Sequence, residues 1–258
     1  MNVLVLLASI LFILMVWIGG KKGARSFFAI FMNFGVLLFA IFFMQNPSND
    51  PYIVTLIACT VISYITLFYI NEVNGTTKTA FLSTIITIVI VLFFIVLVTE
   101  SAMIQGFGEE EIEELSIFSL YIGVDFLKIG VSVIIMSTIG AIIDTAMAIA
   151  SPMREMFHHH PSSSKKDLFK FGISIGRDIL GTSANTLFFA FFGGYLALLI
   201  WFKDLSYSFG EIVNSKIFSA EMITIFCAGT GVALVIPITA LITASFLVKS
   251  RSKEQKSL

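Results

Sequence analysis

The chain has 258 residues, of which 57% are hydrophobic and 13% are charged, and its mean hydropathy is +0.96. Soluble domains are about 45–50% apolar and about 25% charged. This composition excludes an ordinary soluble protein, and with a formal net charge of −1 we expect the partner to be a lipid bilayer rather than a nucleic acid.

Seven apolar segments are long enough to cross a hydrocarbon core, which takes about 20 helical residues. They are residues 2–19, 26–45, 52–70, 79–98, 128–150, 180–202 and 218–247. None shows the sustained alternation of a membrane β-strand. The sequence therefore predicts an all-α integral membrane protein with a single polytopic domain over residues 1–258. An eighth crossing within residues 111–150 is the alternative count.

The basic residues predict the orientation of these segments. Of the 16 Lys and Arg residues, only Lys128, Lys203 and Lys216 fall outside the loops that follow the first, third, fifth and seventh segments. Because cytoplasmic loops carry the excess of basic residues, we expect the N-terminus outside and the C-terminus inside.

This orientation makes residues 99–127 an external loop, which contains the acidic run EEEIEE. A charge run of this kind usually keeps a loop solvated. The alternative is a vestibule that attracts cations.

The segment 128–150 contains an acidic residue, Asp144, where a membrane-spanning helix is expected. A stripe of small or polar residues runs along the same helical face: Ser137, Gly140, Asp144, Ala148 and Ser151. Small residues allow another helix to pack closely, so we expect Gly140, Ser137 and Ser151 to pack against a neighbour. A carboxyl near the membrane centre costs about 2.5–3.5 kcal/mol, so we expect Asp144 to face protein or a water-filled cavity.

The loop 151–179 is then cytoplasmic. Its apolar positions Leu168, Phe171, Ile175 and Ile179 predict an amphipathic helix that lies on the inner leaflet and leads into the sixth segment. Gly172 and Gly176 would let it dock closely on a neighbour.

The run His158–His160 lacks partners at metal-ligand spacing. We therefore expect a hydrated loop there, with no metal and no other cofactor.

The sixth segment begins after Arg177 and Asp178. Asp178, Thr182 and Asn185 follow at i, i+4 and i+7 on one face, with Gly181 beside them as a packing residue. The fifth and sixth segments run antiparallel, which brings Asp144 and Asn185 to nearly the same depth. We therefore expect these two side chains to be in contact.

The last segment contains Gly229, Gly231 and Pro237. Glycine and proline loosen membrane helices, and a broken helix often lines a binding cavity. A passive kink is the alternative.

Two stretches, GAIIDTAMAIASPMREM and GISIGRDILGTSANTLFFAFFGGYLALLIWF, resemble the YibE/F family of bacterial multi-pass membrane proteins. The matching residues are Gly140, Asp144, Ala148, Ser151, Gly176, Arg177, Asp178, Gly181, Asn185 and Thr186. The resemblance covers most of residues 80–245. It implies the bacterial cell membrane and a hetero-oligomer with a larger relative, but no substrate.

Two functions are consistent with these features. In the first, the protein is a permease or permease subunit, in which Asp144 carries protons, Asn185 and Thr182 assist it, and Arg177 with Asp178 forms an inner gate. In the second, the protein is a non-transporting scaffold for a larger relative. The sequence contains no HExxH, GxSxG or paired catalytic carboxylates, so we do not expect an enzyme.

Overall fold

The computed structural model of the protein describes residues 2–102, 125–204 and 206–254. These ranges form helices joined by short links, with no strand among them. The expected all-α architecture is confirmed. The acidic run at 109–114, and with it most of the predicted external loop, lies outside the described residues.

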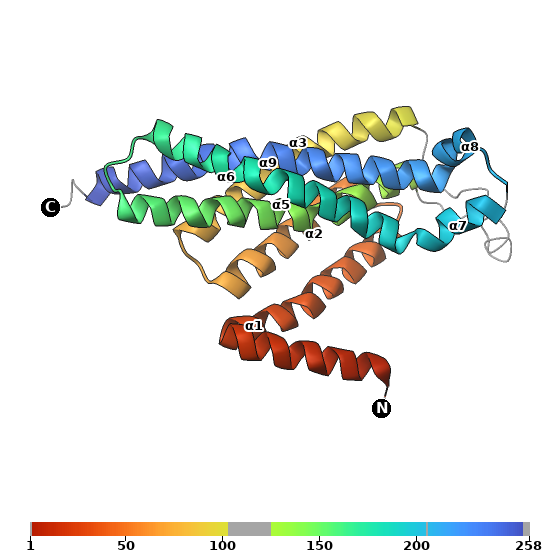
Figure 1. Cartoon of the computed structure of the whole chain (residues 1–258), viewed down its shortest axis with the longest axis horizontal. Helices are drawn as coiled ribbons and strands as arrows, with labels where there is room; N and C mark the ends of the chain where they lie inside the picture. The colour runs from red at the N-terminus through yellow and green to blue at the C-terminus, as the bar shows by residue number, and fades with distance from the viewer. Residues whose placement is uncertain (1, 103–124, 205, 255–258) are drawn as a thin grey trace.

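Three long helices form the centre of the molecule: α3 (Gly75–Ala102), α5 (Phe126–His159) and α9 (Lys216–Glu254). Each packs extensively on the other two. Helix α6 (Lys165–Gly194) lies along α9, and α2 (Pro51–Tyr64) lies against α5 (Figure 1). The core between these helices is apolar and includes Ile88, Val91, Ile135, Ile142, Ala146 and Val235.

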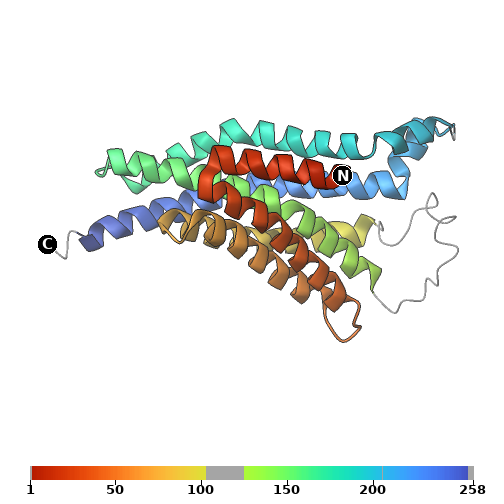
Figure 2. The same cartoon turned by 90° about the horizontal axis from the view of Figure 1, so that it is seen from below.

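Helix α1 (Val3–Met44) bends sharply and folds back on itself, as Figures 1 and 2 both show. The bend is at Gly20, whose φ of 54° and ψ of −134° suit a residue without Cβ. A Cβ on Gly23 would overlap the Met15 carbonyl, so the arms can meet only because this position is glycine. Beyond the bend, the rings of Phe12 and Phe27 lie 4.9 Å apart between centroids.

Five helical segments within the described residues are long and apolar enough to cross a membrane: Val3–Met44, Pro51–Tyr69, Gly75–Ala102, Phe126–His159 and Lys216–Arg251. A sixth arises if α6 and α7 (Leu196–Asp204), which meet at 53°, form one broken span. The prediction of seven separate segments differs because segments 2–19 and 26–45 are the two arms of α1. Segment 52–70 corresponds to α2 followed by η1 (Ile65–Tyr69), a π-helical turn.

The amphipathic helix expected before the sixth segment is not a separate element. It is the first half of α6, which continues without a break into the sixth segment. Its apolar face is covered by protein, because Leu168 is fully buried and α6 packs on α9. A Cβ on Gly176 would overlap the Ile236 side chain, and one on Gly172 would lie 2.8 Å from the Ala240 Cβ. The close docking expected of these two glycines is therefore present.

Helix α9 continues through Pro237 from Lys216 to Glu254. The expected break in this segment is therefore absent, and Pro237 at most introduces a kink.

The two ends of the bundle are held by separate polar contacts. At one end, Lys128 Nζ lies 2.9 Å from Asp50 Oδ2. At the other, Arg25 pairs with Glu72 at 2.9 Å, and Arg251 donates to the Pro161 carbonyl at 2.7 Å. Helix α8 (Phe209–Asn214) lies at the first end, opposite the C-terminus (Figures 1 and 2). Which end faces the cytoplasm stays a prediction.

Candidate functional site

Asp144 lies in a groove of about 460 Å³ between α5 and α6. The α5 wall consists of Gly140, Ala141, Asp144, Thr145 and Ala148. The groove exists because α6 packs mainly on α9 and less closely on α5. Asp144 is exposed within the chain, and its carboxyl makes no hydrogen bond or ion pair with any described residue.

The opposite wall of the groove carries three hydroxyl side chains from α6. Thr182, Ser183 and Thr186 line it together with Ile179 and Leu187. The Thr182 hydroxyl donates to the Ile179 carbonyl and the Thr186 hydroxyl to the Thr182 carbonyl, each at 2.9 Å. Because these two hydroxyls have used their hydrogens, their oxygens can only accept. Together with a carboxylate, they form a site suited to a proton, a cation or a hydrogen-bond donor.

Asn185 does not line this groove, although it lies on α6 between two residues that do. No hydrogen bond joins it to Asp144, so the predicted contact between these residues is absent. The prediction compared how deep the two residues lie along antiparallel helices, but it did not take into account how each helix is rotated about its own axis. Successive helical residues point about 100° apart, which directs Thr186 into the groove and Asn185 to the exposed surface beside it.

Arg177 and Asp178 lie one turn before Thr182 on α6, and both are exposed. Neither forms an ion pair with a described residue. Their role as an inner gate stays a prediction.

The family of the chain follows from a comparison that covers nearly its whole length. A profile of the family described as YibE/F-like protein matches residues 7–249. The chain belongs to this family. None of the curated proteins or solved structures matches it. The match spans both walls of the groove, so the Asp144 site lies within the matched residues.

The four residues predicted to pack against a neighbouring helix do not pack tightly in this YibE/F-like protein. A Cβ on Gly140 or Gly181 would meet no atom within 4 Å among the described residues. Ser137 and Ser151 are exposed as well. These four residues therefore make no tight contact within the described part of the chain, and the tight contacts of α6 are made by Gly172 and Gly176 instead. Ser183 is a groove residue that the sequence reasoning missed, because it lies outside the i, i+4, i+7 series.

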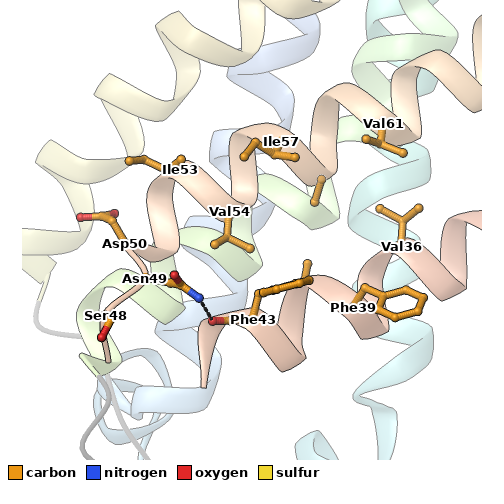
Figure 3. Close-up of a pocket in the computed structure, with 12 residues that line it drawn as sticks. Val36, Phe39, Phe43, Ser48, Asn49, Asp50, Ile53, Val54, Ile57 and Val61 are labelled. Carbon is orange, nitrogen blue, oxygen red and sulfur yellow. Dashed lines mark hydrogen bonds between the residues drawn. The ribbon is translucent and has the colours of Figure 1, made fainter. Parts of the chain in front are cut away.

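A second cavity, of about 590 Å³, lies between the second arm of α1 and α2 (Figure 3). Its walls are mostly apolar, with Ser48, Asn49 and Asp50 at one end. Two of these three side chains are already engaged: Asn49 donates to the Phe43 carbonyl, and Asp50 accepts from the Tyr52 N–H and from Lys128. The cavity therefore has few polar groups that are free to bind a ligand, in contrast to the groove.

One of the histidines at the end of α5 contacts a carboxylate. His159 Nε2 lies 3.1 Å from Glu155 Oε1, one helical turn away. Within the described ranges, no group of three His, Cys, Asp or Glu side chains is placed to hold a metal ion.

Proposed function

We propose that this YibE/F-like protein is a permease, or a subunit of one, in the bacterial cell membrane, and that Asp144 exchanges a proton during transport. The observation that supports this proposal is the Asp144 carboxyl, unpaired among the described residues and facing a groove lined by hydroxyl groups. No covalent chemistry is assigned to the groove.

The energetics of an unpaired intramembrane acid favour a cycle of protonation. The charged form is costly at this depth unless a cation or several donors accompany it. Protonation removes the charge, and a bound cation or donor replaces the proton. The two ligands therefore compete for one carboxyl, which is the requirement for exchanging a substrate against protons. The acceptor-rich α6 wall favours a substrate that is positively charged or rich in hydrogen-bond donors.

The test uses inside-out membrane vesicles that carry a pH-sensitive dye and a respiration-driven proton gradient. A panel of inorganic and organic cations is added, and proton release is followed by dye fluorescence. We expect at least one compound to release protons with the wild type, weakly with Asp144→Glu and not with Asp144→Asn. The matched control is Asp204→Asn, an exposed acid that does not line the groove. If Asp144→Asn matches the wild type at every pH, the proton role is wrong.

A second candidate function is a non-transporting scaffold for a larger YibE/F-family protein. The open space at Gly140 and Gly181 favours it, because a partner helix could approach the groove closely there. In this case Gly140→Leu and Gly181→Leu abolish copurification of the partner, whereas Asp144→Asn retains it. Val89→Leu, on the exposed face of α3, is the control for added bulk. Copurification that survives both glycine variants would exclude this face as the contact.

A further inference from the structure

A layer of hydroxyl side chains lies inside the bundle, separate from the Asp144 groove. Helix α3 contributes Thr79, Ser83, Thr84 and Thr87, and α9 contributes Thr239 and Thr243; all six residues are buried. Most hydroxyls in membrane helices bond to a carbonyl of the preceding turn. Ser83 and Thr87 do so, donating to the Thr79 and Ser83 carbonyls at 2.7 and 2.8 Å.

Three hydroxyls of this layer have no such partner. The Oγ1 atoms of Thr84, Thr239 and Thr243 are buried and make no hydrogen bond within the described chain. The exposed fractions of the three residues are 0, 0 and 1%. A buried hydroxyl without a partner costs roughly 1–3 kcal/mol, so three such groups in one bundle need an explanation.

The packing of α3 against α9 places Thr84 level with Thr239, and Thr243 lies about one helical turn further along α9. A Cβ on Gly75 would lie 3.0 Å from the Phe246 ring, and one on Gly231 would lie 3.6 Å from Val91. The helices are therefore antiparallel. Thr84, between Gly75 and Val91 in sequence, lies opposite the stretch 237–239. It also lies on the same face as Val91, seven residues away, and so points towards α9.

The third wall of the layer is α5. Arg154 Nη1 lies 3.4 Å from Thr76 Oγ1, and Ile142 lies beside Gly231, as Val91 does. Interpolation along the sequence between these two contacts places Thr84 level with the stretch 146–150 of α5. The buried residues of that stretch are Ala146, Ile149 and Ala150, and none of these side chains has a polar atom that could pair with the hydroxyls.

We propose that the three unpartnered hydroxyls of this layer, those of Thr84, Thr239 and Thr243, form a binding site for buried water. An unpartnered hydroxyl has a hydrogen to donate and lone pairs to accept with, so its ligand must do both. Water meets this requirement and typically makes about three hydrogen bonds in protein interiors. A sodium ion satisfies only the lone pairs. A divalent cation would need carboxylate ligands, and the residues of this layer include none.

The first test measures thermal unfolding of the purified full-length protein in detergent. A hydroxyl that binds water is lost in Thr84→Val or Thr239→Val, and we expect each variant to unfold roughly 2–6 °C lower. The double variant should lose less than the sum, because both hydroxyls share the same water. Thr87→Val, which removes a hydroxyl bonded within its own helix, is the control and should stay near the wild-type value. Equal or higher unfolding temperatures for both single variants would overturn the proposal.

The second test detects the water directly. Brief X-ray irradiation in ¹⁸O-water oxidises side chains beside bound water. Met153 is fully buried and lies beside Gly172 together with Ala240, which follows Thr239 in the sequence. We expect ¹⁸O incorporation at Met153 in the wild type and in Thr239→Ser, and at least a threefold loss in the Thr84→Val/Thr239→Val double variant. An unlabelled Met153 in the wild type, or unfolding that depends on sodium and not on potassium or choline, would overturn the proposal.

Discussion

At the scale of single residues, Asp50 shows how one carboxylate performs two structural tasks. It caps α2 by accepting from the Tyr52 N–H at 2.9 Å, and it pairs with Lys128 on α5. The hydrogen bond from Lys128, and after it the one from Tyr52, lower the pKa of Asp50 below its usual value. A carboxylate whose pKa is lower in the folded state contributes stability above its unfolded pKa, and this stability is lost as the pH falls through the folded value.

We therefore expect Asp50→Asn to lower the unfolding temperature at pH 7, and we expect the difference from the wild type to shrink as the pH falls below the usual Asp pKa. Asparagine keeps the capping oxygen, so only the ion pair is removed. Asp50→Ala also removes the cap and should cost about 1 kcal/mol more at every pH. Thermal unfolding between pH 3 and 7 measures both effects. A difference between wild type and Asp50→Asn that does not change with pH would contradict the assignment.

At the scale of elements, the contact of α6 with α9 depends on glycines at defined positions. A Cβ on Gly176 would overlap Ile236, whereas one on Gly181 would meet nothing within 4 Å. We expect Gly176→Ala to destabilise the protein by about 1–3 kcal/mol through overpacking. Gly181→Ala should stabilise it by up to about 1 kcal/mol, because alanine is the better helix former. Chemical denaturation of the two variants measures the contrast, and equal effects would show that α6 does not dock on α9 through Gly176.

The bend of α1 also depends on a glycine. At Gly20 the positive φ is one that other residues rarely adopt, so Gly20→Ala should open the angle between the two arms. Spin labels at Leu4 and Phe39, both exposed, report the distance between the arms. Cys59 and Cys227 are replaced by alanine in the labelled protein. We expect a longer and broader distance distribution in Gly20→Ala, and an unchanged one would mean that the bend is held by contacts elsewhere.

At the scale of the whole molecule, the basic residues and the path of the chain predict one orientation in the membrane. The turn before α2 and the link between α5 and α6 lie at opposite ends of the bundle (Figure 1). If the positive-inside rule applies, Ser48 faces outwards and Ser162 faces the cytoplasm.

Cysteine labelling of intact cells checks this orientation. In a background without Cys59 and Cys227, a membrane-impermeant maleimide should label Ser48→Cys directly and Ser162→Cys only after permeabilisation. The opposite pattern would reverse the topology. Labelling of both in intact cells would show that the two links share one side.

The sequence by itself determined the membrane class, the all-helical fold and the family, because these depend on composition, on the length of apolar runs and on local motifs around Asp144 and Arg177. It also located the close docking glycines Gly172 and Gly176, since their spacing reflects a single helical face. These features are properties of one segment at a time, and no knowledge of the neighbouring helices is needed to recognise them.

Only the tertiary structure decided how the segments combine. That the first two segments form one bent helix depends on contacts across Gly20 and Gly23. That Asp144 faces Thr182, Ser183 and Thr186 rather than Asn185 depends on the rotation of α6, which its packing on α9 sets. The rotation of a helix about its axis is determined by the side chains it meets on other helices, and no local pattern in its own sequence specifies it.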